Sequence, residues 1–185
     1  MIGELPKTLS VNGKLYAIRT DFRDVLKIVC AFEDVELKDR EKIYICLFIL
    51  YEDFESMSES DYEAAFQAAL EFIDHGGQQE KAKSPRIMDW EQDENILFPA
   101  INKVAGFETR AVEYLHWWTF LGYFMEITDG VFSQVLGIRT KKAKHKKLDK
   151  WEQEFYSKNK ALCALRPKLT AQEEEAKKKL NELLG

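Results

Sequence analysis

The sequence predicts a mainly α-helical protein, a helical bundle with a short N-terminal β-hairpin. Through most of the 185 residues, apolar side chains recur at intervals of three and four, which is the period of an amphipathic helix. The hairpin signal is Asn12-Gly13 between two short alternating segments, because both turn positions tolerate positive φ. Apolar residues make up 45% of the chain and charged residues 32%, which favours a folded globular protein over a disordered one.

The front half holds the hairpin and three predicted helices. Residues 8–20 form the hairpin, which needs helices to pack against because an isolated hairpin is marginal in water. Thr20 or Asp21 caps the first helix. Residues 39–51 favour a second helix, although their Ile- and Phe-rich run also fits a buried strand. Since that helix is apolar on all sides, we expect it at the centre of the bundle.

A third helix and a loop complete the front half. Ser58 is expected to cap this helix, with Asp61 in its first turn, and Gly76-Gly77 ends it. The polar residues 78–86 lack periodicity and indicate a loop, which is the one internal linker that the sequence offers. We see no second core large enough to require two domains.

The back half opens with an acidic segment and a predicted helix. Residues 89–94 carry four carboxylates that suit a helix N-terminus, and Pro99 should kink the helix before Gly106 ends it. A further helix is expected over residues 109–127. Because it is apolar nearly all round, it is either the central helix of the fold or a contact surface. A short helix follows Asp129-Gly130 and runs through Leu136.

Toward the C-terminus the chain becomes basic and then poor in apolar residues. Seven positive charges and one aspartate lie between residues 139 and 150, and a helix is expected over residues 147–165. A proline then breaks the pattern, and a capping box at Thr170 starts a last helix. Residues 1–166 are therefore expected to form one domain, and residues 167–185 a helix that is mobile or ordered only against a partner.

Composition excludes several classes of protein. The formal net charge of −5 gives no overall positive field to gather nucleic acid. The three cysteines include no CxxC pair and argue against a disulfide scaffold or a zinc ribbon, so we expect small buried hydrophobes. The N-terminus has no signal-peptide pattern, and the longest apolar run, nine residues, is shorter than the roughly 20 that span a bilayer. A cytoplasmic protein without a membrane segment is expected.

No set of residues has the spacing of a catalytic or metal site. Glu113-x-x-His116 is half of a di-iron carboxylate site, but the other histidines, His75 and His145, lack a glutamate three residues earlier. The favoured interpretation of His116 is a hydrogen-bonded core residue. The sequence also lacks the glycine motifs that bind nucleotides. We therefore expect no enzyme, no metal and no cofactor.

Two sets of residues are candidates for contacts with other molecules. The aromatic segment and the C-terminal helix supply candidates for protein binding: Trp117, Trp118, Phe120, Phe124, Leu180, Leu183 and Leu184. The basic run supplies candidates for electrostatic contact: Arg139, Lys141, Lys142, Lys144, Lys146 and Lys147. In the simpler interpretation, the aromatics fill the core and the lysines form a solvated helix face. Nucleic-acid binding is the weaker alternative, because aromatics are not interleaved with the basic residues.

A set of short motifs carries a resemblance to a known family. The motifs are Asp89-Trp90, Asp93, Ile96, Ala100, Gly106, Leu115-His116-Trp117-Trp118-x-Phe120 and Gly137-Ile138-Arg139. They resemble a small protein family of siphophages and prophages of Gram-positive bacteria that is known by a gene-product number. The hairpin and the helix start at Asp21 fit too, so the resemblance covers nearly the whole chain. Its most specific part is the His-Trp-Trp segment, and Pro99 departs from the pattern.

The resemblance implies a role in building a long non-contractile phage tail. Such proteins are regarded as tail assembly chaperones, which coat the tape-measure protein in the host bacterial cytoplasm before the tail tube forms around it, and then leave. The implied partners are the tape-measure protein, other tail proteins and further copies of the chain. The alternatives are a minor structural tail or connector protein of the virion and, with less support, a nucleic-acid-binding regulator.

Overall fold

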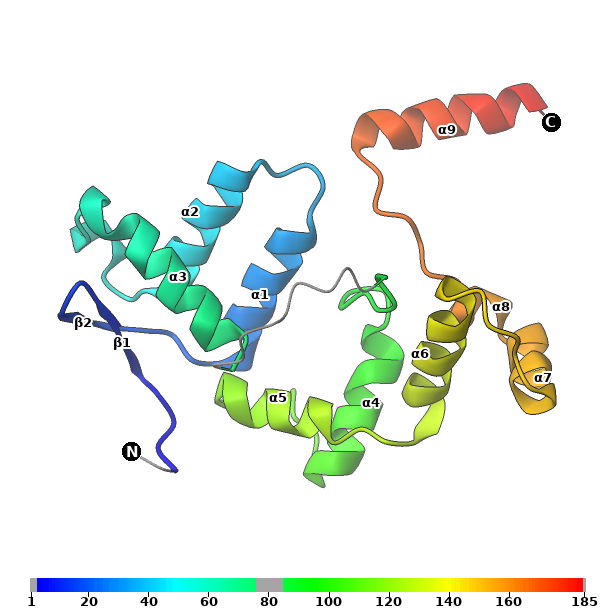
Figure 1. Ribbon diagram of the computed structural model, residues 1–185, viewed down its shortest axis with the longest axis horizontal. Helices are drawn as coiled ribbons and strands as arrows, with labels where there is room; N and C mark the ends of the chain where they lie inside the picture. Colours follow the sequence, from blue (N-terminus) through cyan, green and yellow to red (C-terminus); the bar gives the residue numbers. More distant parts are fainter. Residues whose placement is uncertain (1–2, 76–84, 185) are drawn as a thin grey trace.

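The computed structural model describes residues 3–75 and 85–184, and this part of the chain is mainly helical (Figure 1). In chain order its elements are β1 (Thr8–Val11), β2 (Lys14–Ala17), α1 (Phe22–Glu33), α2 (Asp39–Leu50), the 3-10 turns η1 (Phe54–Ser56) and η2 (Glu59–Asp61), α3 (Tyr62–Ile73), α4 (Glu94–Ala105), α5 (Trp117–Met125), α6 (Gly130–Ala143), α7 (Lys150–Lys158), α8 (Lys160–Cys163) and α9 (Ala171–Leu184). The predicted helical fold with an N-terminal hairpin is confirmed.

β1 and β2 form the predicted hairpin. The strands are antiparallel, and the two turn residues, Asn12 and Gly13, have φ of +49° and +81°. This left-handed pair explains why the Asn-Gly dipeptide stands here. The hairpin is fixed to the segment before α3, because the Asp61 carboxylate accepts hydrogen bonds from the Asn12 amide (2.8 Å) and the Tyr16 hydroxyl (2.9 Å).

The start of α3 differs from the prediction. Ser58 precedes η2, and its hydroxyl pairs with that of Ser60 (2.8 Å) without capping the helix. Asp61 was expected in the first turn of this helix, but its carboxylate binds the hairpin instead. The predicted helix end at Gly76-Gly77 and residues 78–84 of the predicted loop lie outside the described residues.

α1 and α2 confirm two predicted helices. The Asp21 carboxylate accepts a hydrogen bond from the Arg23 amide (3.0 Å) and caps α1. α2 is a helix, so the alternative of a buried strand is wrong. Its last turn is covered by the Arg19 guanidinium, which donates to the carbonyls of Ile49 and Tyr51 (each 2.9 Å). These bonds satisfy carbonyls that a helix end leaves without partners.

The apolar sequence of α2 predicted a helix at the centre of the bundle, but the structure does not place it there. One side, with Cys46, Leu47 and Leu50, is buried in the core. On the other side Tyr44 and Phe48 are exposed. The prediction was wrong because the run of apolar residues gives no sign of which side lacks a neighbour.

α4 contains Pro99 within a helix that continues to Ala105. Gly106 ends it as predicted, with a φ of +79° that closes the last turn. Beyond it, the predicted helix over 109–127 is wrong for its first half, since residues 109–116 are not helical and α5 begins at Trp117.

A pairing between distant backbone segments explains this late start of α5. The Phe22 amide donates to the Leu115 carbonyl (3.0 Å), and the Trp117 amide donates to the Thr20 carbonyl (2.7 Å). These bonds tie the entry of α1 to the entry of α5. They use backbone groups that a longer helix would have paired internally.

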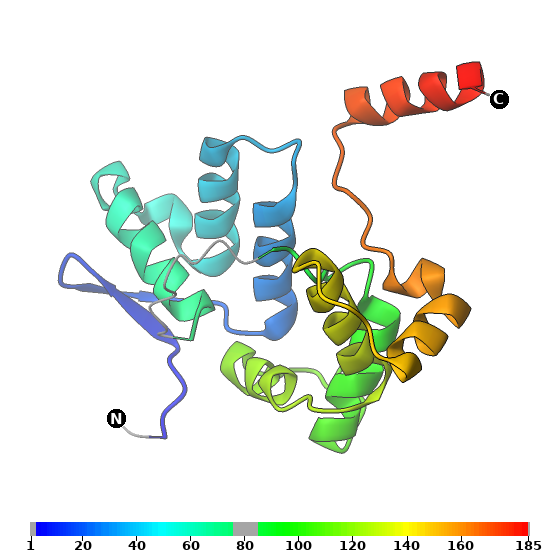
Figure 2. The same cartoon turned by 45° about the vertical axis from the view of Figure 1, so that its right-hand side comes forward.

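The C-terminal helices also differ in length from the prediction. α6 continues past Leu136 to Ala143, and the helix expected over 147–165 is divided into α7 and α8, since Asn159 leaves the helical conformation (φ −126°, ψ 38°). Val135, Ile138 and Cys163 form a small buried cluster that joins α6 to α8. In Figures 1 and 2, α9 projects beyond the other helices, and its described side chains are exposed.

Candidate protein-binding surface

The two tryptophans of the His-Trp-Trp motif fasten α5 to the end of α3. The indole N–H of Trp117 donates to the Ile73 carbonyl (2.9 Å), and that of Trp118 donates to the Phe72 carbonyl (2.8 Å). Both acceptors lie in the last turn of α3, where few helical amides remain to pair with carbonyls, and the Phe72 carbonyl also accepts from the His75 amide (3.2 Å). The motif therefore closes a helix end that lies more than 40 residues away in the sequence.

His116 fastens the same joint to the N-terminal segment. Its Nδ1 accepts a hydrogen bond from the Trp118 amide (3.0 Å) and caps α5, while Nε2 faces the Pro6 carbonyl (3.0 Å). An accepting Nδ1 carries no proton, so the imidazole is neutral and Nε2 is the donor. Burial lowers the pKa of His116, which favours this neutral form. Glu113 is exposed and outside any helix, so the two residues do not form half of a di-iron site.

The aromatic residues predicted to bind a protein contribute to the core. Trp117 is 2% exposed and Phe120 is 0% exposed. Trp118 and Phe124 are half-buried, Trp118 stacked on Phe72 with ring centroids 5.9 Å apart. This burial agrees with the simpler interpretation, in which the aromatics fill the core. Only the half-buried pair leaves any surface for a partner.

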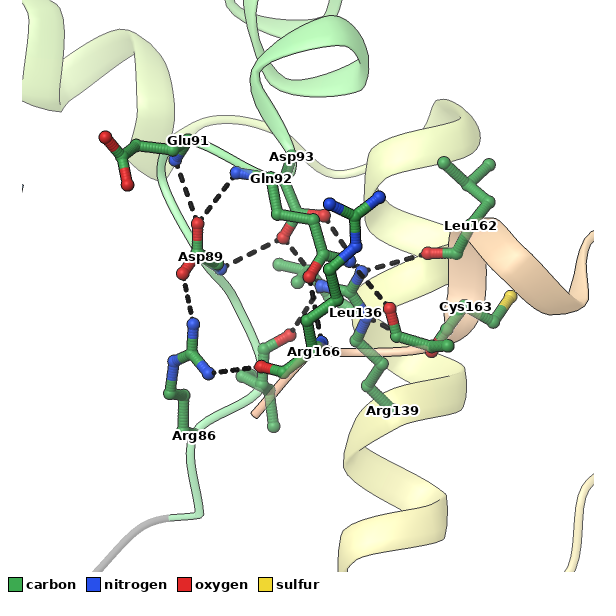
Figure 3. A network of polar contacts seen from close by, with 12 residues as sticks. Arg86, Asp89, Glu91, Gln92, Asp93, Leu136, Arg139, Leu162, Cys163 and Arg166 are labelled. Atoms are coloured by element: carbon green, nitrogen blue, oxygen red, sulfur yellow. Dashed lines mark hydrogen bonds and ion pairs between the residues drawn. The ribbon is translucent and has the colours of Figure 1, made fainter. Parts of the chain in front are cut away.

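Arg139, predicted as a surface cation, lies at the centre of a buried network (Figure 3). Its guanidinium donates twice to the Asp93 carboxylate (2.6 and 2.8 Å), and the two side chains are 4% and 1% exposed. It also donates to the carbonyls of Ile87 (3.1 Å), Leu162 (2.9 Å) and Cys163 (3.3 Å). The prediction for Arg139 is therefore wrong, since a buried guanidinium cannot contact a partner.

Asp89 extends this network toward residues 164–170, the segment between α8 and α9. Its amide donates to the Asp93 carboxylate (3.0 Å), and its carboxylate accepts from the Gln92 amide (2.7 Å) and pairs with Arg86 and Lys168. Burial alone would raise the pKa of Asp89, but the Gln92 amide and the two cations outweigh burial and lower it. Asp89 and Asp93, expected at a helix N-terminus, precede α4 and are buried, because Arg139 and Lys168 from later segments pair with them.

The lysines of the basic run have two different surroundings. Lys141 pairs with Glu152 (2.5 Å), and Lys142 donates to the Tyr156 hydroxyl (2.6 Å), so both are engaged by α7. Three lysine side chains are exposed in the connection from α6 to α7: Lys144, Lys146 and Lys147. This connection is the part of the run that still fits an electrostatic contact.

The cysteines are poor nucleophiles in this environment. Burial raises the pKa of Cys46 to about 12 and that of Cys30 to about 11, so little thiolate exists at neutral pH. Across residues 3–75 and 85–184, no group of three His, Cys, Asp or Glu side chains could hold a metal ion. In the same ranges, no helix combines the length and apolarity needed to cross a bilayer.

An aromatic patch covers the outer side of α2 and the segment after it. Tyr44 and Phe48 are 56% and 51% exposed and stack with centroids 6.0 Å apart. Phe54 meets both rings edge-on (5.3 and 6.2 Å), and Tyr62 packs on Phe54 (5.2 Å). We call these four residues the aromatic patch. It was not predicted, although the i,i+4 spacing of Tyr44 and Phe48 is the signal that puts both on one face.

A groove of about 360 Å³ lies between α6 and α7. Ile138 and Phe155 supply apolar wall, and Glu152 and Glu154 supply carboxylates. Trp151 stands at this α6–α7 groove with 81% of its surface exposed. It lies on α7, the first part of the helix that was expected over residues 147–165. Such a tryptophan is a strong candidate for a contact residue.

The candidates in α9 remain only partly placed. Leu180 is 54% exposed. The side chains of Leu183 and Leu184 lie outside the described part of the chain.

Comparison with known proteins gives one match. A family model described as Bacteriophage Gp15 protein matches residues 1–165, which include the hairpin, the His116-Trp117-Trp118 motif and Arg139. No curated protein and no solved structure matches the chain. Because the matched segment covers most of the 185 residues, this chain belongs to the Bacteriophage Gp15 protein family and is a phage protein.

Proposed function

We propose that this protein is a phage tail assembly chaperone that binds the tape-measure protein in the host bacterial cytoplasm and catalyses no reaction. Membership of a phage protein family supports the phage context. The finer assignment rests on one observation, the exposed aromatic patch with Tyr44 and Phe48 at its surface.

The geometry of the patch suits an amphipathic helix. A tape-measure protein is long and helical, and before assembly it exposes apolar stripes with residues three and four apart. Tyr44 and Phe48 are themselves one turn apart, so their stacked rings form an apolar ridge that such a stripe can cover. Aromatic side chains are frequent anchors in protein interfaces because they bury much area at a small entropic cost.

The modest size of the patch fits a contact that must later be released. Two half-exposed rings supply far less area than the roughly 800 Å² per partner of a stable complex. The tail tube can therefore displace the chaperone when it polymerises. A repeated, weak contact along the tape measure gives coverage through many copies.

Affinity capture from phage-producing cells tests this function. The tagged wild-type chain should capture the tape-measure protein and should be absent from purified virions. Tyr44→Ala combined with Phe48→Ala should lose at least about 30-fold in tape-measure binding, since anchor residues contribute 2 kcal/mol or more. Met125→Ala is the matched control, because it removes an exposed apolar side chain at a different surface.

Two results would contradict the proposal. Stoichiometric presence in purified virions would identify a structural tail or connector subunit. Full tape-measure capture by the Tyr44/Phe48 double variant would show that the aromatic patch is not the binding surface.

A further inference from the structure

α9 has 14 residues, and every side chain of it that the structure describes is exposed. A helix this short is marginal in water unless another surface covers it. Ala176 and Leu180 lie one turn apart on one side, and in the sequence Leu183 and Leu184 continue that spacing. An apolar stripe of this kind normally lies against another element.

The segment between α8 and α9, residues 164–170, holds the start of α9 away from the α6–α7 groove of its own chain. The Arg166 amide donates to Gln92 (2.9 Å), and the Arg166 carbonyl accepts from Arg86 (2.9 Å). Lys168 then pairs with Glu33 (2.8 Å), at the end of α1. In both Figure 1 and Figure 2, α9 lies apart from α7. With its start held beside α1, the helix is free to meet a different copy.

A further contact holds the first residue of α9 in the same place. The Ala171 amide donates to the carboxylate of Glu36, in the segment that follows α1. The length of α9, about 21 Å at 1.5 Å per residue, then extends outward from this point.

The charges of α9 and of the groove match when the two helices run antiparallel. α7 places Trp151, Glu152 and Glu154 along the groove, and Lys158 follows one turn later. In the opposite order, α9 begins with glutamates at 173–175, continues with three consecutive lysines at 177–179, and then reaches Leu180. An antiparallel alignment of α9 on α7 therefore sets the glutamates near Lys158, the lysines near Glu152 and Glu154, and Leu180 near Trp151.

The groove charges also have partners within the chain. Glu152 pairs with Lys141 (2.5 Å), and Glu154 pairs with Lys158 (2.7 Å). A carboxylate accepts several donors, so lysines of α9 can join these pairs without breaking them. Trp151 and Phe155 supply the apolar surface that Leu180 needs.

We propose that α9 of one copy docks in the α6–α7 groove of a second copy, with Leu180 against Trp151 and Lys177–Lys179 beside Glu152 and Glu154. Exchange in both directions gives a two-fold dimer in which each copy completes the other's groove. The dimer needs no phage partner, so this proposal stands or fails independently of tape-measure binding.

Sedimentation of the purified full-length chain at several concentrations tests the proposal. Trp151→Ala should weaken dimerisation by about 30-fold or more. Glu154→Lys and Lys178→Glu should each weaken it about three- to tenfold, and the two changes combined in one chain should restore it. Tyr44→Ala, which removes an exposed aromatic from the aromatic patch, should leave the dimer unchanged. All these side chains are exposed, so the fold is retained.

Cross-linking distinguishes exchange from docking within one chain. A tagged copy with Glu154→Cys and an untagged copy with Lys178→Cys, both carrying Cys30→Ser, should give a cross-linked species that contains both chains. A wild-type chain that is monomeric at every concentration overturns the proposal. So does a dimer that is insensitive to Trp151→Ala and to the charge exchange, or the absence of a cross-linked species that contains both chains.

Discussion

Replacing Arg139 by methionine removes the cation that faces Asp93 in the interior. The change deletes two bonds to the Asp93 carboxylate and three to main-chain carbonyls. Methionine is similar in length, so the cavity left behind is small and the main cost is the uncompensated charge of Asp93, which is 1% exposed. Breaking a buried ion pair from one side costs about 3–5 kcal/mol.

This loss is large against the whole stability of a domain, which is about 5–15 kcal/mol. For a chain of this length each kcal/mol lowers Tm by about 2–4 °C, so Arg139→Met should lower Tm by roughly 6–20 °C. Urea unfolding followed by circular dichroism measures the difference. Lys144→Met is the matched control, because it removes an exposed cation a few residues away, and it should change stability by less than about 0.5 kcal/mol.

A second substitution separates the ion pair from simple packing. Combining Arg139→Met with Asp93→Leu removes both charges, and the double variant should lose less stability than the sum of the two single variants. Some loss remains, because the Asp89 amide gives up its acceptor. If Arg139→Met costs less than about 1 kcal/mol, or if the two changes are additive, the network does not have the role assigned to it.

Three further predictions concern the joint and the helix ends. Stability should fall as pH drops below about 6.5, the ordinary pKa of histidine, because burial lowers the pKa of His116 in the folded state and the unfolded chain then binds more protons. Urea unfolding midpoints between pH 7.5 and 5.5 measure this fall. His116→Asn keeps the helix cap and should flatten the pH dependence. Trp117→Phe should cost about 2–4 kcal/mol, since it leaves a cavity and removes the indole donor of the Ile73 carbonyl. Trp118→Phe keeps its stacking on Phe72 and should cost about 1 kcal/mol; equal costs in urea unfolding would contradict the assigned contacts. Gly106→Ala should cost about 1 kcal/mol because the φ of Gly106 is +79°. Gly137→Ala, within α6 and with open space around it, should be neutral or stabilising by up to about 1 kcal/mol. Thermal unfolding of both variants tests this, and a lower Tm for Gly137→Ala than for Gly106→Ala would contradict it.

Elements that depend on neighbouring residues were predictable from the sequence. The Asn12-Gly13 turn, the Asp21 cap and the Gly106 helix end each rest on contacts or backbone angles within a few residues. Where distant segments compete for the same backbone groups, local patterns failed. Residues 109–116 have a helix-compatible sequence, yet their backbone pairs with the entry of α1.

The candidate surfaces were harder to predict, because exposure depends on which neighbours arrive. The segment around Tyr44 is apolar at nearly every position, so no polar side marks the face that stays in solvent. Conversely, the aromatic residues of α5 looked like a contact surface because they are numerous. Most of them are needed to close α3 and to pack against Phe22, whose ring stacks on that of Phe120 (4.4 Å).

Arg139 shows how a local pattern can mislead and what signal corrects it. It belongs to a run of basic residues, which made it look like part of a solvated face. On the α6 helix, however, it lies four residues after Val135 and seven after Phe132, both buried, so the helical period already places it on the inward side. A cation on an inward face must find a carboxylate. Which carboxylate it finds depends on packing, because Asp93 is 46 residues away in the sequence.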